Sequence, residues 1–303
     1  MINIVGIGAN VCDTLITVPN YPKEDTKLRA NTITQSGGGP CATGLVAASK
    51  LGAKCAYIGM LTDDSAGKFL MEDMDKYGVS TEFVGVVAGY TSFSSYIWLA
   101  DDKATRTCVF HKGNIPAWNL TDAQKKAIAH AQILMVDGND MFQALEGVKI
   151  AKENGTKVLY DAGGLYEGVE NLLPYADILI PSEEFALGHT QAENTEEAAR
   201  ILFEKYKPEI VVITQGKEGG VLYDGREFTR YPAFLVDAVD SNGSGDVFHG
   251  AFAFAITNKM SYDKACVFSS GVSALKCTKI GARCGVPTYE ETINFLKENN
   301  YEL

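Results

Sequence analysis

The stretch VDSNGSGDVFHGAFAFAI, residues 239–256, sets three turn-forming residues and an acid directly before an apolar run. Small residues recur at helical spacing after Asp246, so a helix is predicted to begin here. Two interpretations are open. Asp246 is either a first-turn acid favoured by the helix dipole, or a proton acceptor beside an anion cradle. In the second case, the backbone N–H groups of Gly243, Ser244 and Gly245 form the cradle at the positive helix end.

Composition predicts one large domain over residues 1–303. The chain is 46% hydrophobic and 21% charged, which suffices for a sizeable core. Its net charge of -11 argues against a nucleic acid or an anionic membrane as partner, because both require a basic surface. Seven scattered cysteines without CxxC spacing favour reduced thiols and a cytoplasmic location. No leader-like segment or apolar stretch of membrane-spanning length is evident.

Strand-like and helical patterns alternate along most of the chain, which predicts an α/β fold with crossover helices. The strand-like runs are residues 2–7, 54–59, 132–137, 156–161, 177–180 and 210–214, and clear helical patterns cover 41–51 and 141–154. Two segments, 13–35 and 83–111, depart from this alternation, and the second reads as two strands around the polar turn ADDKAT. We expect them to form a small β-rich lid.

Two further glycine-rich stretches precede possible ligand sites. GIGANV, residues 6–11, follows a strand but lacks the third glycine of a dinucleotide motif and a following helical pattern. SGGGPCATGLVAASKLGA, residues 36–53, sets a glycine run before a helix of small residues, which allows backbone to approach a ligand closely. The alternative for this second stretch is a plain turn and a buried helix.

Taken together, these motifs resemble the ribokinase-like carbohydrate kinases of the PfkB family over nearly the whole chain. Gly38, Gly39 and the helix that follows match the N-terminal diglycine signature, and residues 240–246, DSNGSGD, match the C-terminal signature. The resemblance implies a three-layer α/β/α domain with a mainly parallel central sheet and a lid. It also implies an enzyme that transfers the γ-phosphate of ATP to a sugar hydroxyl, with Asp246 as general base and an anion hole from residues 243–245.

The same resemblance assigns the substrate-binding and nucleotide-binding residues. Asp13 matches the family acid that accepts hydrogen bonds from sugar hydroxyls, with a polar strand-end residue as the alternative. The remaining sugar-site residues are Gly38, Gly39, Thr43 and Lys27. Lys27 either meets an anionic substituent or is a solvated lid lysine. The nucleotide-binding residues are Thr214, Gly216, Gly219 and Ser270.

The metal assignments depart from the family pattern. Ser182 and Phe185 stand where the family carries the Asn and Glu that support magnesium, so Glu183 or Glu184 is either a substitute ligand or a helix-cap residue. A monovalent cation such as K⁺ is a further candidate beside the anion hole. Its candidate ligands are Asp240, Asn242, Gly281 and Gly285, the last two in TKIGARCGVP, residues 278–287. The alternative is that Asp240 simply caps the turn through the amide of Asn242.

The substrate remains open between several classes. The motifs GGGPCAT, GDVFHGA and ALKCT favour a ketose or ketose derivative, as in sulfofructose kinases, while Phe93, Tyr96 and Trp98 keep a nucleoside kinase open. A catalytically idle sugar-binding homologue is the third possibility. We expect ATP, Mg²⁺ and a small sugar as ligands, a homodimer formed through the lid, and His249 and His111 as packing or rim residues.

Overall fold

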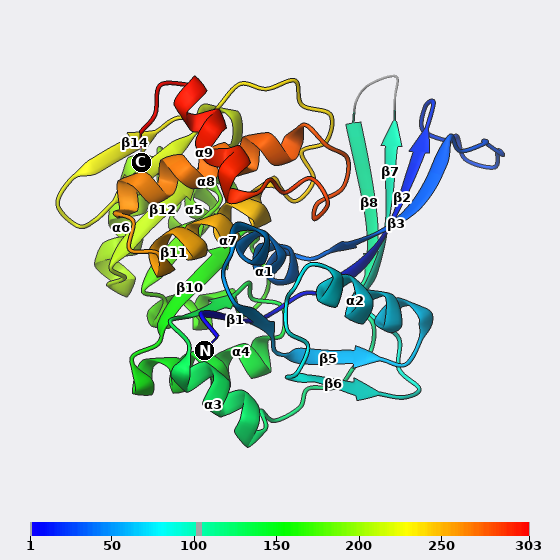
Figure 1. Ribbon diagram of the computed structural model, residues 1–303, viewed down its shortest axis with the longest axis horizontal. Coiled ribbons are helices and arrows are strands. Elements are labelled where there is room, and N and C mark those ends of the chain that lie inside the picture. The colour runs from blue at the N-terminus through cyan, green and yellow to red at the C-terminus, as the bar shows by residue number, and fades with distance from the viewer. Residues whose placement is uncertain (1, 101–104, 303) are drawn as a thin grey trace.

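The structure, a computed structural model, describes residues 2–100 and 105–302. The predicted ADDKAT turn includes residues 101–104 and so lies outside the described residues. Figure 1 shows a layered body with a narrow sheet standing out from one side. This arrangement confirms the predicted α/β class with a mainly parallel central sheet.

Eight strands form the central sheet in the order β14-β13-β12-β11-β10-β9-β1-β4. Their bounds are β1 Ile4–Ile7, β4 Cys55–Tyr57, β9 Ile133–Val136, β10 Lys157–Ala162, β11 Ile178–Pro181, β12 Ile210–Thr214, β13 Gly220–Tyr223 and β14 Phe228–Tyr231. The six strands from β12 to β4 run parallel, and β13 and β14 add antiparallel pairs at one edge. Because both faces of a parallel sheet are covered, its strands are apolar throughout, as ILMV of β9 illustrates.

Two helical layers cover the two faces of this sheet (Figure 1). The helices of the first layer are α1 Pro40–Leu51, α7 Ser244–Thr257, α8 Tyr262–Cys277 and α9 Tyr289–Glu298. Those of the second are α3 Asp122–His130, α4 Met141–Asn154, α5 Glu183–Thr190 and α6 Thr195–Tyr206. Each layer has its own apolar core. α7 contacts both α1 and α8, and Gly250 of α7 lies against the backbone of Gly44 of α1.

A separate four-stranded sheet, β3-β2-β7-β8, projects from the body. Its strands are β2 Val11–Val18, β3 Thr32–Gly38, β7 Ser94–Ala100 and β8 Thr105–His111. They come from the two segments proposed as a lid. The start of the second segment behaves differently, because β6 Val84–Val87 pairs with β5 Gly59–Thr62, beside α2 Ser65–Lys76.

All seven cysteines are free thiols, in agreement with the reduced state expected from their spacing. Among the described residues, no helix combines the length and apolar character needed to cross a membrane.

Candidate active site

The first turn of α7 forms an open cradle of backbone amides. Gly243 caps the helix with φ of 74°, a left-handed conformation that favours glycine, and a Cβ there would lie 2.6 Å from the Cβ of Ala282. A Cβ at Gly245 would meet no atom within 4 Å, so this side of the turn faces open space. Since the first amides of a helix have no intrahelical acceptor, the turn suits an anion. The Ser244 amide differs, because it donates to the Ser241 carbonyl at 3.2 Å.

Three side chains contact the carbonyl oxygens of this turn. Lys276 Nζ donates to the Asn242 carbonyl, Ser273 Oγ to that of Ser244 at 2.8 Å, and His249 Nδ1 lies 2.6 Å from that of Gly245. In a trans peptide, C=O and N–H point in opposite directions. Holding these carbonyls therefore aims the next amides, those of residues 243, 245 and 246, away from the three side chains.

His249 also ties α7 to the ends of two sheet strands. Its Nε2 lies 3.0 Å from the Ile180 carbonyl of β11 and 3.3 Å from Asp161 Oδ1 of β10. Both ring nitrogens can donate at once only in the doubly protonated imidazole. Burial raises the pKa of Asp161, while the electrostatic interaction with His249 lowers it. The residue expected to pack or line a rim thus makes specific polar contacts.

Asp246 lies in the first turn of α7, half-buried and close to a second carboxylate. Burial raises the pKa of Asp13 to about 6, and the charge of Asp246 contributes in the same direction, so the two groups interact across the site. Asp13 is 6% exposed, and its Oδ1 accepts a 2.6 Å hydrogen bond from Ser95 of β7. Asp13 belongs to β2 of the projecting sheet and Asp246 to the first turn of α7, so the two carboxylates come from different elements of the fold.

A cavity of about 360 Å³ opens beside Asp13, between the projecting sheet and α1. Gly39 and Asn242 line it as well, so three predicted residues meet there. Gly38 lies directly against Asp13, because a Cβ at Gly38 would be 2.0 Å from Asp13 Oδ2. The glycine pair thus lets the backbone approach the carboxylate.

Most of the other residues expected at the sugar site do not line this cavity. Thr43 is fully buried in α1 below Gly243, and its hydroxyl has no hydrogen-bond partner among the described residues. Lys27 is exposed in the connection between β2 and β3 and does not line the cavity, whereas Lys112 does. Of the three aromatic residues considered, only Phe93 lines the cavity, together with Phe110 at a ring distance of 6.0 Å.

Arg283 binds the carbonyl oxygen of Gly38, and the sequence did not predict a role for this residue. Its side chain is 1% exposed and donates to Asp73 of α2 at 2.6 Å, to Asn10 at 2.8 Å and to the Gly38 carbonyl at 2.6 Å. A buried guanidinium that donates through both terminal nitrogens to three different partners fixes their relative positions. It therefore couples the loop after α8 to the sugar-site strand β3.

Three of the four predicted nucleotide residues, Thr214, Gly216 and Gly219, lie at or just after the end of β12, whereas Ser270 lies in α8. Thr214 ends this strand, and Gly216, with φ of 56°, faces open space. A Cβ at Gly219 would lie 2.1 Å from the Tyr231 carbonyl, so this glycine serves the close approach of two strands. Ser270 is buried in α8, and its hydroxyl donates to the Pro232 carbonyl at 2.5 Å. This contact joins α8 to the segment that follows β14.

The residues considered for magnesium have clear local roles. Ser182 caps α5 by accepting from the Phe185 amide at 3.1 Å, and Phe185 is fully buried against the core. Glu183 accepts from Gln215 at 2.8 Å, and Glu184 is exposed. Within the described residues, no group of three or more His, Cys, Asp or Glu side chains is arranged to hold a metal. Magnesium bound at this site would therefore depend largely on nucleotide phosphates for its ligands.

The candidate cation residues already have partners. Asp240 Oδ1 accepts from the Asn242 amide at 2.8 Å, and Oδ2 from the Gly281 amide at 2.8 Å. Gly285 packs against the backbone of α8, since a Cβ there would lie 2.8 Å from the Lys276 carbonyl. The turn-cap alternative for Asp240 is thus the arrangement observed.

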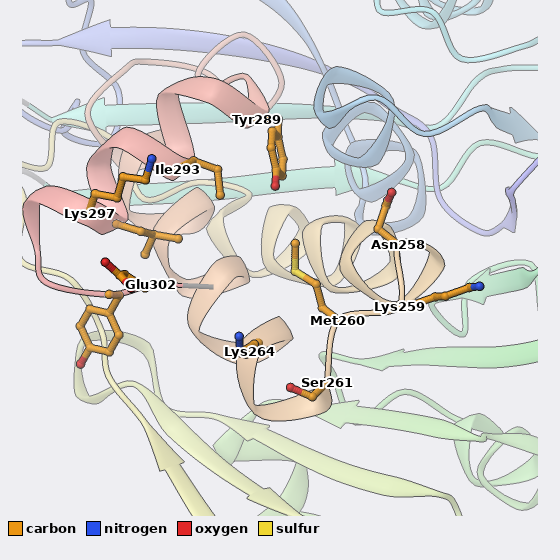
Figure 2. A pocket seen from close by; sticks show the side chains of 11 residues that line it. Asn258, Lys259, Met260, Ser261, Lys264, Tyr289, Ile293, Lys297 and Glu302 are labelled. Atoms are coloured by element: carbon orange, nitrogen blue, oxygen red, sulfur yellow. The ribbon is translucent and has the colours of Figure 1, made fainter.

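A larger cavity, of about 640 Å³, lies apart from these residues. Figure 2 shows its lining, which comes from the connection between α7 and α8, the start of α8, α9 and the last residues of the chain. The lining includes Lys259, Lys264 and Lys297. None of the predicted site residues lines it. The smaller cavity beside Asp13 is therefore the candidate site.

Comparison with known proteins identifies the family. A family model described as pfkB family carbohydrate kinase matches residues 1–289. The chain belongs to this family. The predicted ribokinase-like fold and the prediction of an ATP-dependent carbohydrate kinase are confirmed.

Relatives and solved structures agree with this assignment. The Haemophilus influenzae ribokinase is 28% identical over 297 residues, which cover 96% of this chain and 97% of the relative. A 5-dehydro-2-deoxygluconokinase of Halalkalibacterium halodurans is 23% identical, with 95% and 92% covered. The Arabidopsis thaliana ribokinase, solved with ribose and ATP, has a TM-score of 0.88 at 24% identity, with 98% and 99% covered. This last similarity shows the fold.

Proposed function

We propose that this pfkB-family enzyme transfers the γ-phosphate of ATP to a hydroxyl of a small carbohydrate bound beside Asp13. One observation carries the proposal. Asp246 stands at the open amide cradle of α7 and interacts with the buried Asp13 of the cavity. This arrangement brings a proton acceptor, an anion site and a hydroxyl-binding carboxylate together.

In this proposal the chain acts mainly by positioning its reactants. Asp13 and the backbone at Gly38 and Gly39 orient the sugar. Asp246 accepts the proton of the attacking hydroxyl as its oxygen bonds to the γ-phosphorus and the bond to the ADP oxygen breaks. The amides of the cradle stabilise the charge on the transferred group.

The nucleotide fits the open features of the site. Gly216 and the cradle at Gly245 both face free space, as a nucleotide site requires. Mg²⁺ bound with ATP would neutralise phosphate charge, and Glu184 is the exposed carboxylate near this edge that remains a candidate for a water-mediated contact. Glu183 is bonded to Gln215 and is the weaker candidate.

Among carbohydrates we favour a ketose or ketose derivative, on the motifs of the sequence. Ribose is the first competitor, because ribokinases are among the relatives. Phe93 and Phe110 in the cavity keep a nucleoside as a second competitor. A coupled ADP-release assay over ketoses, aldoses and nucleosides separates them. We expect the highest kcat/KM for a ketose; no turnover of any member would refute the proposed function.

We also propose that two copies associate through the projecting sheet. Tyr96 and Val109 are directly paired across β7 and β8, and both are exposed, as is Ile33 on β3. The strand register places all three on the face opposite Asp13 and Ser95. An apolar outer face of this kind is typical of an interface. Light scattering after gel filtration should give a dimer, and Val109→Lys should give a monomer.

A further inference from the structure

The structure buries an ammonium group directly behind the anion cradle. Lys276, in the last turn of α8, is 0% exposed. Its Nζ donates to the Asp240 carbonyl at 2.7 Å and to the Asn242 carbonyl, and it lies 3.9 Å from Asp240 Oδ2. A buried lysine normally requires such compensation, because desolvation disfavours the charged form.

The surroundings favour a positive charge at this point. The amides of Val239 and Asp240 donate to the Cys277 carbonyl, which holds the segment 239–242 against the C-terminal end of α8. The carbonyl groups at a helix C-terminus carry the negative end of the helix dipole. Lys276 therefore lies among backbone oxygens and one carboxylate, the ligand type that an alkali cation would also use.

The monovalent cation expected from the sequence does not fit these residues as they are arranged. Asp240 and Asn242 were two of its four candidate ligands, with Gly281 and Gly285, but the carbonyl oxygens of Asp240 and Asn242 bind the Lys276 ammonium. Both carboxylate oxygens of Asp240 accept from backbone amides, those of Asn242 and Gly281. The oxygen atoms that Asp240 and the Asn242 carbonyl would offer a K⁺ ion are thus already bonded to groups of this chain.

We propose that the Lys276 ammonium replaces a monovalent cation in this enzyme, so that its activity does not require K⁺. The mechanism is positional. By holding the Asn242 carbonyl, Lys276 orients the N–H of Gly243, which belongs to the same peptide unit, toward the cradle. Lys276 is therefore a positioning residue for the anion hole, and the inference rests on the proposed function of that hole.

The first test uses the unaltered enzyme. Turnover of the best carbohydrate is measured at constant ionic strength in potassium chloride and in tetramethylammonium chloride. We expect kcat values that agree within about twofold, because the Lys276 ammonium takes the place of the K⁺ ion. Activation by K⁺ of about fivefold or more would overturn the proposal.

The second test removes the ammonium. In tetramethylammonium chloride, we expect Lys276→Ala to lower kcat by about tenfold or more, since the hole loses its preorganisation. K⁺ or NH₄⁺ should restore much of this loss by entering the vacated space. Lys276→Met fills that space and should stay inactive in every salt. Lys279→Ala, which alters an exposed lysine three residues further on, should behave as wild type.

A third measurement does not depend on turnover. The melting temperature of Lys276→Ala should rise on replacing tetramethylammonium by K⁺, whereas those of wild type and Lys276→Met should not. If no carbohydrate is phosphorylated in any salt, the proposed function fails while this measurement still decides the role of Lys276. Wild-type kcat in both Lys276 variants, or a K⁺-dependent melting temperature in the wild type alone, would overturn the inference.

Discussion

At the residue scale, the burial of Asp13, the proposed sugar-binding carboxylate, lowers the free energy of unfolding at neutral pH. Burial raises its pKa to about 6 from an ordinary value of 3.8. The folded state therefore holds this proton more tightly than the unfolded chain does. The contribution of Asp13 to the free energy of unfolding is lost as the pH rises from about 4 to about 6.

We therefore expect Asp13→Asn to be more stable than wild type at pH 7, and this advantage to shrink toward pH 4.5. Urea unfolding at both pH values measures it. Asp237→Asn, which alters an exposed aspartate, is the control and should change little at either pH. An Asp13→Asn variant with equal or lower stability at pH 7 would contradict the assigned burial cost. For the wild type, kcat/KM for the sugar should fall below about pH 6, as the carboxylate is protonated.

Residues in the two glycine signatures were predictable from sequence, whereas the cations that support them were not. Gly38, Gly39, Asp13 and Asp246 stand in local patterns that match motifs of the family. Lys276 and Arg283 act through partners far away in the chain, Asp240 and Asp73 respectively. The available signal was a single lysine within the otherwise small or apolar run VSALKC of α8. Such a residue is buried only if the fold supplies oxygen partners.

Arg283 acts at the scale of elements, because it connects the loop after α8 to α2 and β3. Removing one partner of a buried ion pair leaves the other charge uncompensated, which costs about 3–5 kcal/mol. We expect Arg283→Met to lower the free energy of unfolding by about this amount, as measured by urea unfolding. In the double variant Arg283→Met with Asp73→Asn, part of the loss should be recovered. Additive effects of the two substitutions would contradict a direct pair.

The projecting sheet is the second element whose behaviour can be tested. We propose that β7 and β8 close over the bound sugar, since closure excludes water from the transferred phosphate. Amide hydrogen exchange of residues 94–100 and 105–111 should slow when sugar and a nucleotide analogue are both bound. Amide exchange in α6, which belongs to the second helical layer, serves as the internal reference. Unchanged exchange at saturating ligand would argue against a moving lid.

The element boundaries show what the sequence could specify. Strands of the parallel sheet were predicted within one or two residues, because their apolar runs are bounded by turn signals. The segment 83–111 was less readable, since Val84–Val87 pairs with Gly59–Thr62 and not with the projecting sheet. Both arrangements satisfy the same short apolar pattern, and only the tertiary position of α2 distinguishes them.

At the scale of the whole molecule, the fold brings the projecting sheet, the start of α1 and the loop before α7 together around the cavity that Asp13 and Asn242 line. The relative positions of Lys276, the amide cradle and the glycine pair depend on the contacts of α7 with α1 and with α8. Sequence alone indicated the components of this site in order along the chain. It could not give their distances, because these depend on packing between layers.

The turnover of Asp246→Asn tests the central claim most directly. The substitution keeps the size of the side chain and removes the proton acceptor. With the preferred carbohydrate at saturating ATP, we expect kcat to fall by about 10²-fold or more, with ATP affinity and melting temperature close to those of wild type. A variant that keeps near-wild-type kcat would contradict the account, because Asp246 would then not be the base.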